Sequence, residues 1–265
     1  MRPALLRSSF CSARRFRDMF SRIRLATFAL VFAVLPLAAQ QVSWPTTHQQ
    51  ALWVTTSVEH ELSARTALWF DGSWRRMGIG EEPQQLLLRP GIIRTLAPGV
   101  RVGAGYTYVA TAPYGELPAA TPTREHRLWQ DLRLAASYGP VNVTQRFRWE
   151  QRWLAPLVQG TLGEFAYQQR ARYMIRAQAP LGARRIGTRA VTWYAQEELL
   201  LPVGHDGAAG RFAQNRFLVG VGLPVAARQR VDVGYQNLWN ALPSRSANEV
   251  NHVVTLSMVI TSGRR

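Results

Sequence analysis

The chain has 265 residues, of which 47% are hydrophobic and 18% are charged, so it is neither an intrinsically disordered chain nor a soluble protein with a heavily charged surface. Its formal net charge is +16, and all 32 basic residues are arginines. Cys11 is the single cysteine, which excludes a disulfide framework and a metal site built from several cysteines. The length suits one large β domain or two ordinary domains.

The first 39 residues differ from the rest of the chain. A segment rich in arginine, from Arg14 to Arg24, precedes an apolar run from Leu25 to Ala39 that only Thr27 interrupts. A basic segment, a short apolar segment and small residues at its end are typical of a secretory signal peptide, whereas an uncleaved anchor needs about 20 apolar residues. We therefore expect residues 1–39 to be a cleaved signal peptide, with Met19 as a second candidate start, and residues 40–265 to form one domain.

After the leader, apolar and polar residues alternate with a period of two, which is typical of β-strands. In the clearest segment, residues 141–153, Phe147 and Trp149 lie on one face while Arg146 and Arg148 lie on the other. Most such segments are longer than the roughly 5–6 residues typical of globular strands, and their length suits tilted strands that cross a bilayer. The eleven segments are 51–60, 66–76, 84–96, 100–110, 124–138, 141–153, 164–178, 187–200, 211–223, 228–240 and 249–261.

The connections between these segments alternate between short ones, such as 63–65 and 98–99, and longer ones, such as 77–83 and 111–123. Outer-membrane barrels are wired in this way, with short turns on one side and long loops on the other. We therefore predict an all-β fold: a closed, antiparallel, up-and-down transmembrane β-barrel of about 12 strands, with about ten as the rival count. Bacterial barrels have an even strand number, so residues 42–50 are expected to supply the twelfth strand. A soluble exported β-sandwich with the same alternation is the competing class.

Aromatic residues gather toward the ends of the strands that lead into the longer connections. Such sorting by strand direction is typical of the aromatic girdle of a membrane barrel, and a soluble sandwich gives no reason for it. The predicted girdle consists of Trp74, Tyr106, Tyr108, Trp149, Trp153, Tyr167 and Trp239.

Five short stretches occur in an order and spacing that look specific. They are Trp53-Val54-Thr55-Thr56 with Glu59, Gly103-Ala104-Gly105-Tyr106-Thr107-Tyr108, Glu125-His126-Arg127, residues 146–152 and residues 215–222. Together they resemble a bacterial family known as domain of unknown function 2490 (DUF2490), over nearly the whole chain after the leader. The resemblance implies a β-barrel in the outer membrane of a Gram-negative bacterium, without an assigned biochemical activity, and adds nothing about a substrate.

The polar faces of the strands carry many arginines and fewer carboxylates. One reading is a structural network inside the barrel, because the arginine fork binds carboxylates bidentately and stays charged. The alternative is a narrow conduit that favours anions, because rings of arginine select them. The predicted interior residues are Arg127, Asp131, Arg133, Arg146, Arg148, Glu150, Arg152, Arg170, Arg172, Arg176, Glu198, Arg216 and Asp232, with Glu59 and Asp71 on the same side.

No combination of residues indicates catalysis. Three serine–histidine pairs are conceivable: Ser57 with His60, Ser137 with His126, and Ser257 with His252. None of them lies in a nucleophile elbow, and no zinc-protease motif is present. We therefore expect no enzyme activity, no cofactor and no metal, with a barrel hydrolase as the remaining enzymatic alternative.

The arginines are spread along many strands instead of forming a basic run or a basic helix, which argues against nucleic-acid binding. The expected partners are outer-membrane lipid and small anionic solutes, and the expected location is the bacterial outer membrane. A structural barrel whose long connections bind partners is the other function that the sequence leaves open.

Overall fold

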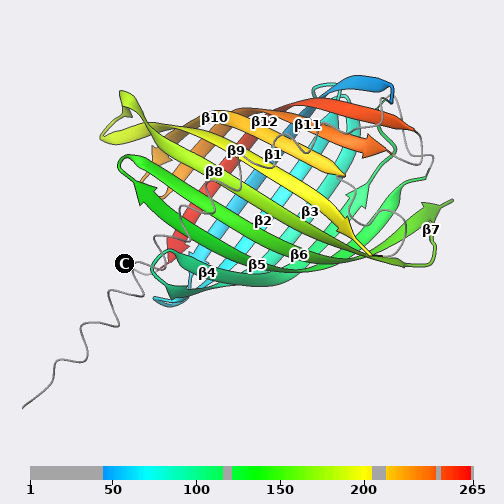
Figure 1. Cartoon of the computed structure of the whole chain (residues 1–265), viewed down its shortest axis with the longest axis horizontal. Helices are drawn as coiled ribbons and strands as arrows, with labels where there is room; N and C mark the ends of the chain where they lie inside the picture. Colours follow the sequence, from blue (N-terminus) through cyan, green and yellow to red (C-terminus); the bar gives the residue numbers. More distant parts are fainter. Residues whose placement is uncertain (1–43, 116–120, 205–212, 243–245, 264–265) are drawn as a thin grey trace, which may run out of the picture. The chain divides into compact units, whose positions relative to one another are not determined.

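Residues that alternate with a period of two form long strands throughout the chain (Figure 1). The computed structural model describes residues 44–265 except 116–120, 205–212, 243–245 and 264–265, so the predicted signal peptide lies outside the described residues. The strands are β1 (Thr46–Glu61), β2 (Thr66–Met77), β3 (Glu82–Ala97), β4 (Val100–Thr111), β5 (Thr123–Tyr138), β6 (Val141–Val158), β7 (Thr161–Leu162), β8 (Ala166–Ile186), β9 (Arg189–Val203), β10 (Gln214–Ala226), β11 (Gln229–Leu242) and β12 (Ala247–Gly263). Eleven of them, all except β7, correspond to the eleven predicted segments.

These eleven strands close into a barrel in sequence order, with β6 next to β8 and β12 next to β1. The prediction of an all-β closed barrel with about twelve strands is therefore confirmed. The alternative of a soluble β-sandwich is wrong, because a sandwich consists of two separate sheets and this sheet closes on itself.

The closure between β1 and β12 differs from the prediction. Every other neighbouring pair is antiparallel, but β1 and β12 are parallel, from Thr46 opposite Asn248 to Glu61 opposite Gly263. Successive strands of an up-and-down barrel alternate in direction, so an odd number of strands makes the first and the last run the same way. The expectation of a fully antiparallel barrel is wrong for this one pair.

The predicted twelfth strand at residues 42–50 is wrong in its described part. Residues 46–50 are the beginning of β1, and Pro45 stands just before the strand, where a missing N–H is tolerated. The additional strand is β7, whose two residues pair with Leu157 and Val158 at the end of β6. It extends from one end of the barrel (Figure 1).

The two ends of the barrel have different connections. At one end, which we call the turn end, hairpins of two to four residues join β1–β2, β3–β4, β5–β6, β8–β9 and β10–β11. At the other, which we call the loop end, connections of four residues follow β2 and β11, and longer connections follow β4, β6 and β9. Because the strand number is odd, β1 begins at the loop end and β12 finishes at the turn end.

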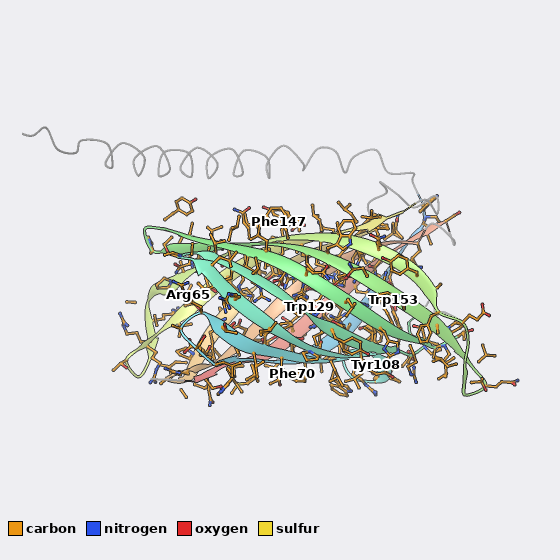
Figure 2. The ribbon with its side chains drawn as sticks, turned by 90° about the horizontal axis from the view of Figure 1, so that it is seen from below. Arg65, Phe70, Tyr108, Trp129, Phe147 and Trp153 are labelled. Atoms are coloured by element: carbon orange, nitrogen blue, oxygen red, sulfur yellow. The ribbon has the colours of Figure 1, made fainter. Side chains whose placement is uncertain are left out.

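Apolar side chains cover much of the outside of the wall, and many charged side chains lie inside it. Phe147 is 42% exposed and lies on the outer surface (Figure 2), as do Phe70 and Leu256. On the opposite face of the strands, Arg148 is 4% exposed and Glu150 is 2% exposed. This is the reverse of the distribution in a soluble protein.

A buried tryptophan explains a group of glycines in β3 and β4. Trp129 is fully buried in the wall, and its Nε1 donates a hydrogen bond to the Tyr106 carbonyl at 3.2 Å. A Cβ atom at Gly91 or Gly105 would lie 2.4 Å from the Trp129 ring, so only glycine leaves room for the indole. These glycines let a bulky side chain fill the interior.

Candidate functional site

An ion-pair network of arginines and carboxylates lines the barrel interior. It arises because residues two positions apart on a strand share a face, and neighbouring strands bring these faces together. Among the residues that the structure describes, twelve arginines share seven carboxylates in thirteen ion pairs, so arginine is in excess by five within this network. The network consists of Arg89, Arg101, Arg127, Arg133, Arg146, Arg148, Arg152, Arg170, Arg172, Arg176, Arg216 and Arg230, with Glu59, Asp71, Glu125, Asp131, Glu150, Glu198 and Asp232.

Glu198 on β9 is the most shared carboxylate. Its Oε1 lies 2.6 Å from Arg146 Nη2 and 2.7 Å from Arg172 Nη2, and its Oε2 lies 3.5 Å from Arg216 Nη1. Arg172 also reaches Glu150 on β6, with Nη1 2.8 Å from Oε1. Side chains from β6, β8, β9 and β10 thus form one continuous cluster.

Asp131 on β5 holds a second cluster. It accepts from Arg133, two residues along the same strand face, at 3.1 Å, and from Arg148 on β6 at 2.7 Å. The Arg148 guanidinium also lies over the Trp129 ring, 4.2 Å from its centroid. The guanidinium of Arg148 is therefore stabilised both by a carboxylate and by an aromatic face.

All thirteen residues that the sequence predicted for the interior belong to this network. The structure adds interior residues that the sequence analysis did not place there, among them Arg75, Arg89, Arg101 and Glu125. Counting in twos from Asp71 along the same strand would have found Arg75. For Arg89 such counting is obscured, because the pairing of β2 with β3 shifts register near Gln84.

The network is more accessible at the turn end than at its centre. At the turn end, the side chains of Arg101 and Glu59 are 33% and 24% exposed. At the centre, those of Arg148 and Asp131 are 2% and 0% exposed. Solvent therefore enters the interior from the turn end.

An apolar cluster occupies the interior toward the loop end. Tyr114, from the β4–β5 connection, packs against it, and burial raises the pKa of Tyr114 to about 12. The next residue, Gly115, lies so close to Gln49 of β1 that a Cβ would overlap the Gln49 amide. The described start of this connection therefore folds over the loop end. The cluster consists of Ala51, Trp53, Met77, Leu238 and Val253.

A polar cavity of about 220 Å³ lies within the network. Its walls include seven arginines and three carboxylates, together with Trp53, Trp69 and Tyr194. The charged wall residues are Arg75, Arg89, Arg146, Arg148, Arg172, Arg176, Arg216, Asp71, Glu198 and Asp232.

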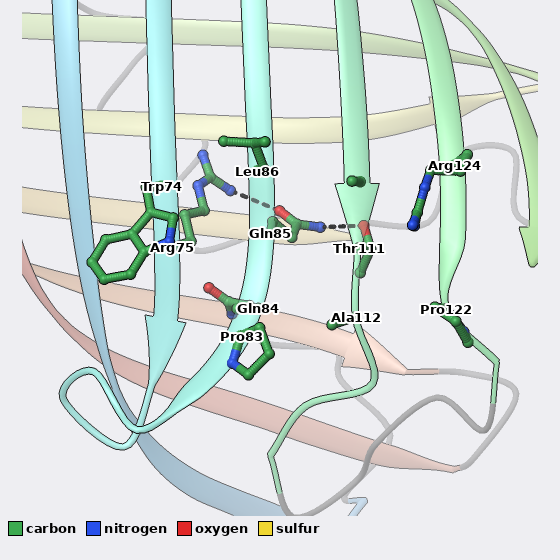
Figure 3. A pocket seen from close by; sticks show the side chains of 11 residues that line it. Trp74, Arg75, Pro83, Gln84, Gln85, Leu86, Thr111, Ala112, Pro122 and Arg124 are labelled. Carbon is green, nitrogen blue, oxygen red and sulfur yellow. Dashed lines mark hydrogen bonds between the residues drawn. The ribbon is translucent and has the colours of Figure 1, made fainter. Parts of the chain in front are cut away.

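A second cavity, also of about 220 Å³, lies between β2, β3, β4 and β5 nearer the loop end (Figure 3). Its lining is mainly apolar, with Trp74, Pro83 and Leu86 among its residues. Arg75 lines both cavities, and its Nη1 donates to Gln85 Oε1 at 3.0 Å. The two cavities are thus neighbours that differ in polarity.

Of the predicted girdle residues, Trp149 lies at the middle of β6, and the others lie in the halves of the strands nearer the loop end, as Tyr108 and Trp153 show in Figure 2. Tyr108, His126, Trp153 and Tyr167 are direct neighbours across β4, β5, β6 and β8 and form one row. The Trp153 and Tyr167 ring centroids are 5.3 Å apart. Trp74, Tyr106 and Trp149 are exposed on the outer face, and Trp239 pairs with Val250 near the start of β12.

The structure does not bring together the residues of any of the three serine–histidine pairs. Ser57 and His60 are three positions apart on β1, and His252 and Ser257 are five apart on β12, so each pair points to opposite faces. His60 Nδ1 instead lies 2.9 Å from Ser262 Oγ.

In the third pair, His126 and Ser137 lie eleven residues apart on β5, also an odd number that places them on opposite faces. The Ser137 hydroxyl donates to Asn142 Oδ1 at 2.7 Å, while His126 contacts Tyr106. Within the described residues, no group of three histidine, cysteine or acidic side chains is arranged to hold a metal. In the same part of the chain, no helix is long and apolar enough to cross a membrane.

Comparison with known proteins agrees with the resemblance noted in the sequence. An uncharacterized protein of Methylorubrum extorquens is 25% identical over 244 residues, which cover 91% of this chain and 97% of the relative. The family model described as "Protein of unknown function (DUF2490)" matches residues 50–249. The chain belongs to this family.

Proposed function

We propose that the protein is an outer-membrane β-barrel whose arginine-rich interior binds small anions. The observation that carries the proposal is the reversed distribution of side chains, with apolar residues outside a closed wall and an ion-pair network inside it. A closed barrel satisfies its backbone hydrogen bonds within the sheet, which a bilayer requires of any strand that spans it.

Three further features support a membrane location. The eleven barrel strands have 12 to 21 residues, long enough to cross the hydrocarbon layer at a tilt. The aromatic row of Tyr108, His126, Trp153 and Tyr167 lies near one end of the wall, as interfacial aromatics do. The leader predicted in residues 1–39 would direct the chain out of the cytoplasm.

Binding of small anions is favoured over passage of large solutes. Barrels of eight strands are filled by side chains and those of about sixteen strands leave a channel, so an eleven-strand barrel is intermediate. Here the twelve arginines of the network and Arg75 extend into the interior, and an apolar cluster with Tyr114 occupies the loop end. The remaining space is small and positively charged.

A narrow anion-preferring conduit is the second candidate, and the excess of five arginines over carboxylates favours it. Purified protein in planar bilayers discriminates the two. Stepwise conductance with anion preference, lost when Arg170 and Arg172 are both replaced by Gln, supports the conduit. Silent bilayers support a closed barrel that binds anions, or one whose long connections bind partners.

Cell fractionation tests the membrane location. The protein should be found in the outer-membrane fraction, require detergent for extraction, and migrate faster on gels before boiling than after it. N-terminal sequencing of the extracted protein should show a chain that begins near Gln40. Recovery of a folded, soluble monomer without detergent would contradict the proposal.

A further inference from the structure

We propose that the central polar cavity is a binding site for a small oxyanion with the charge and size of inorganic phosphate, and that the anion enters from the turn end. The inference deepens the proposed function, because it names the site and the chemical class of the anion. It does not depend on where in the cell the barrel resides.

The charge of the cavity wall favours an anion. Seven arginines and three carboxylates line it, which leaves four positive charges without a carboxylate of the wall to balance them. Buried charges are costly unless they are paired or hydrogen-bonded. A bound oxyanion with two negative charges would offset part of this excess and accept several hydrogen bonds.

Arg75 is the arginine of the wall that is best placed to bind it. Arg75 is 7% exposed, and it takes part in none of the thirteen ion pairs of the described residues. Its guanidinium lies 3.6 Å from the Trp53 ring centroid, and its hydrogen bonds go to the neutral side chains of Ser73 and Gln85. Stacking on Trp53 fixes the plane of the fork, and a fixed fork is suited to bidentate recognition of an oxyanion.

Buried donors without a partner point to the same cavity. Arg146 Nε, Arg148 Nε and Gln236 Nε2 have no hydrogen-bond partner among the described residues, and all three residues line the cavity. All three atoms are N–H donors. Such groups are rare in native proteins because each costs free energy, so a group of donors around one cavity indicates an acceptor between them.

The size of the cavity limits the ligand. Its volume of about 220 Å³ is below the roughly 300–1,000 Å³ of pockets that hold drug-sized ligands. An inorganic oxyanion with a few waters fits a space of this size. Several convergent donors also favour a polyatomic oxyanion over chloride, which accepts hydrogen bonds at a single atom.

The route of entry follows from the two ends of the barrel. Toward the loop end, the cluster of Trp53, Met77, Leu238 and Val253 with Tyr114 covers the interior. Toward the turn end, the Arg101–Glu59 pair is partly exposed, and so is Arg230, whose side chain is 31% exposed. A basic, hydrated vestibule therefore leads to the cavity from the turn end.

Isothermal titration of the purified barrel in detergent with inorganic phosphate tests the site. Wild-type protein should show saturable binding to one site, and sodium chloride at equal ionic strength should give none. The Arg75→Gln variant should bind about tenfold or more weakly, as the loss of one charge-assisted hydrogen bond predicts. Arg75→Gln leaves no carboxylate unpaired, so the fold should persist, and faster migration on unboiled gels checks that it does.

Arg152→Gln is the matched control. Arg152 belongs to the same network but does not line the cavity, and its carboxylate partner Glu125 keeps Arg127. Phosphate binding by this variant should stay within about twofold of wild type, because the lost charge lies outside the site. Equal weakening in both variants, or equal heats with chloride, would overturn the site and indicate general charge screening.

A second measurement covers the case in which Arg75→Gln does not fold. Ser257 lines the cavity, whereas Ser137 is exposed at the turn end and lies outside it. Phosphate should slow the reaction of Ser257→Cys with an anionic thiol reagent and leave Ser137→Cys unaffected. No protection at Ser257→Cys would refute the site, whereas protection in a barrel recovered without detergent would refute only the membrane location.

Discussion

Arg172 on β8 and Glu150 on β6 form an ion pair across neighbouring strands, with Nη1 2.8 Å from Oε1, although they are not opposite each other in the register. Arg172 stands directly opposite Arg148, and Glu150 stands directly opposite Arg170. Like charges directly opposite are destabilising, whereas diagonal neighbours remain within reach of long side chains. The diagonal contact of Arg172 with Glu150 therefore relieves the opposition between two arginines.

Replacing Glu150 by Gln should strongly destabilise the barrel. Arg170 would lose its only carboxylate partner in the network, while Arg172 would keep Glu198. Breaking a buried ion pair from one side costs about 3–5 kcal/mol, so the unfolding midpoint in urea should fall clearly. Glu164→Gln, at an exposed acid in the β6–β8 connection, should have little effect, and equal losses would contradict the interior placement of Glu150.

Stability should fall between about pH 10 and pH 12 because of Tyr114. Burial raises the pKa of Tyr114 to about 12, whereas an unfolded tyrosine titrates near 10. The folded state therefore holds the proton more tightly, and the stabilisation is full below pH 10 and is lost as the pH rises through 12. The difference corresponds to about 2–3 kcal/mol.

Thermal unfolding of wild type and Tyr114→Phe at pH 9 and pH 11 measures this effect. The variant should lose less stability between the two values than wild type does, because no phenol remains to ionise at that position. Tyr138→Phe, which changes an exposed tyrosine, should retain the wild-type dependence. Identical pH dependence in Tyr114→Phe and wild type would show that Tyr114 does not close the loop end.

A charge on the outer wall should be costly in a depth-dependent way if the barrel spans a bilayer. On β6, Phe147 lies nearer the turn end than Trp153 of the aromatic row, whereas Tyr167 on β8 belongs to that row. Arginine at the midplane of a membrane barrel costs about 2–4 kcal/mol and near the interface about 0–1 kcal/mol. In lipid vesicles, Phe147→Arg should therefore lower the free energy of unfolding much more than Tyr167→Arg.

The side chains of Phe147 and Tyr167 are similarly exposed, at 42% and 47%, so the two variants differ mainly in their position along the wall. In a protein surrounded by water, both substitutions would change stability by about 0.5 kcal/mol or less. Small and equal effects of the two variants in vesicles would therefore argue against a membrane location.

The odd strand number should place the start of β1 and the end of β12 on opposite sides of the membrane. β1 begins at the loop end and β12 finishes at the turn end, because β1 and β12 run parallel. An epitope inserted just before Thr46 and one added after Gly263 should differ in accessibility to antibody on intact cells. Equal accessibility of both epitopes would indicate an even number of strands and a different closure.

The strands and their two faces can be predicted from the sequence alone, because alternation with a period of two is a local property. It thus placed Arg146, Arg148, Glu150 and Glu198 on the inner face and Phe147 on the outer face before any strand was paired. The aromatic row could be anticipated in the same way, from the direction of each strand and the length of each connection.

The closure of the barrel and the pairing of its charges depend on contacts between residues far apart in sequence. Residues 46–50 have a strand pattern whether they begin β1 or form a separate strand, and only their parallel pairing with β12 distinguishes the two. Arg146 and Glu198 are 52 positions apart in sequence, and Arg75 meets Gln85 and Trp53 of the neighbouring strands instead of a carboxylate. Such partners depend on the stagger of all eleven strands together, and no local pattern of residues specifies that stagger.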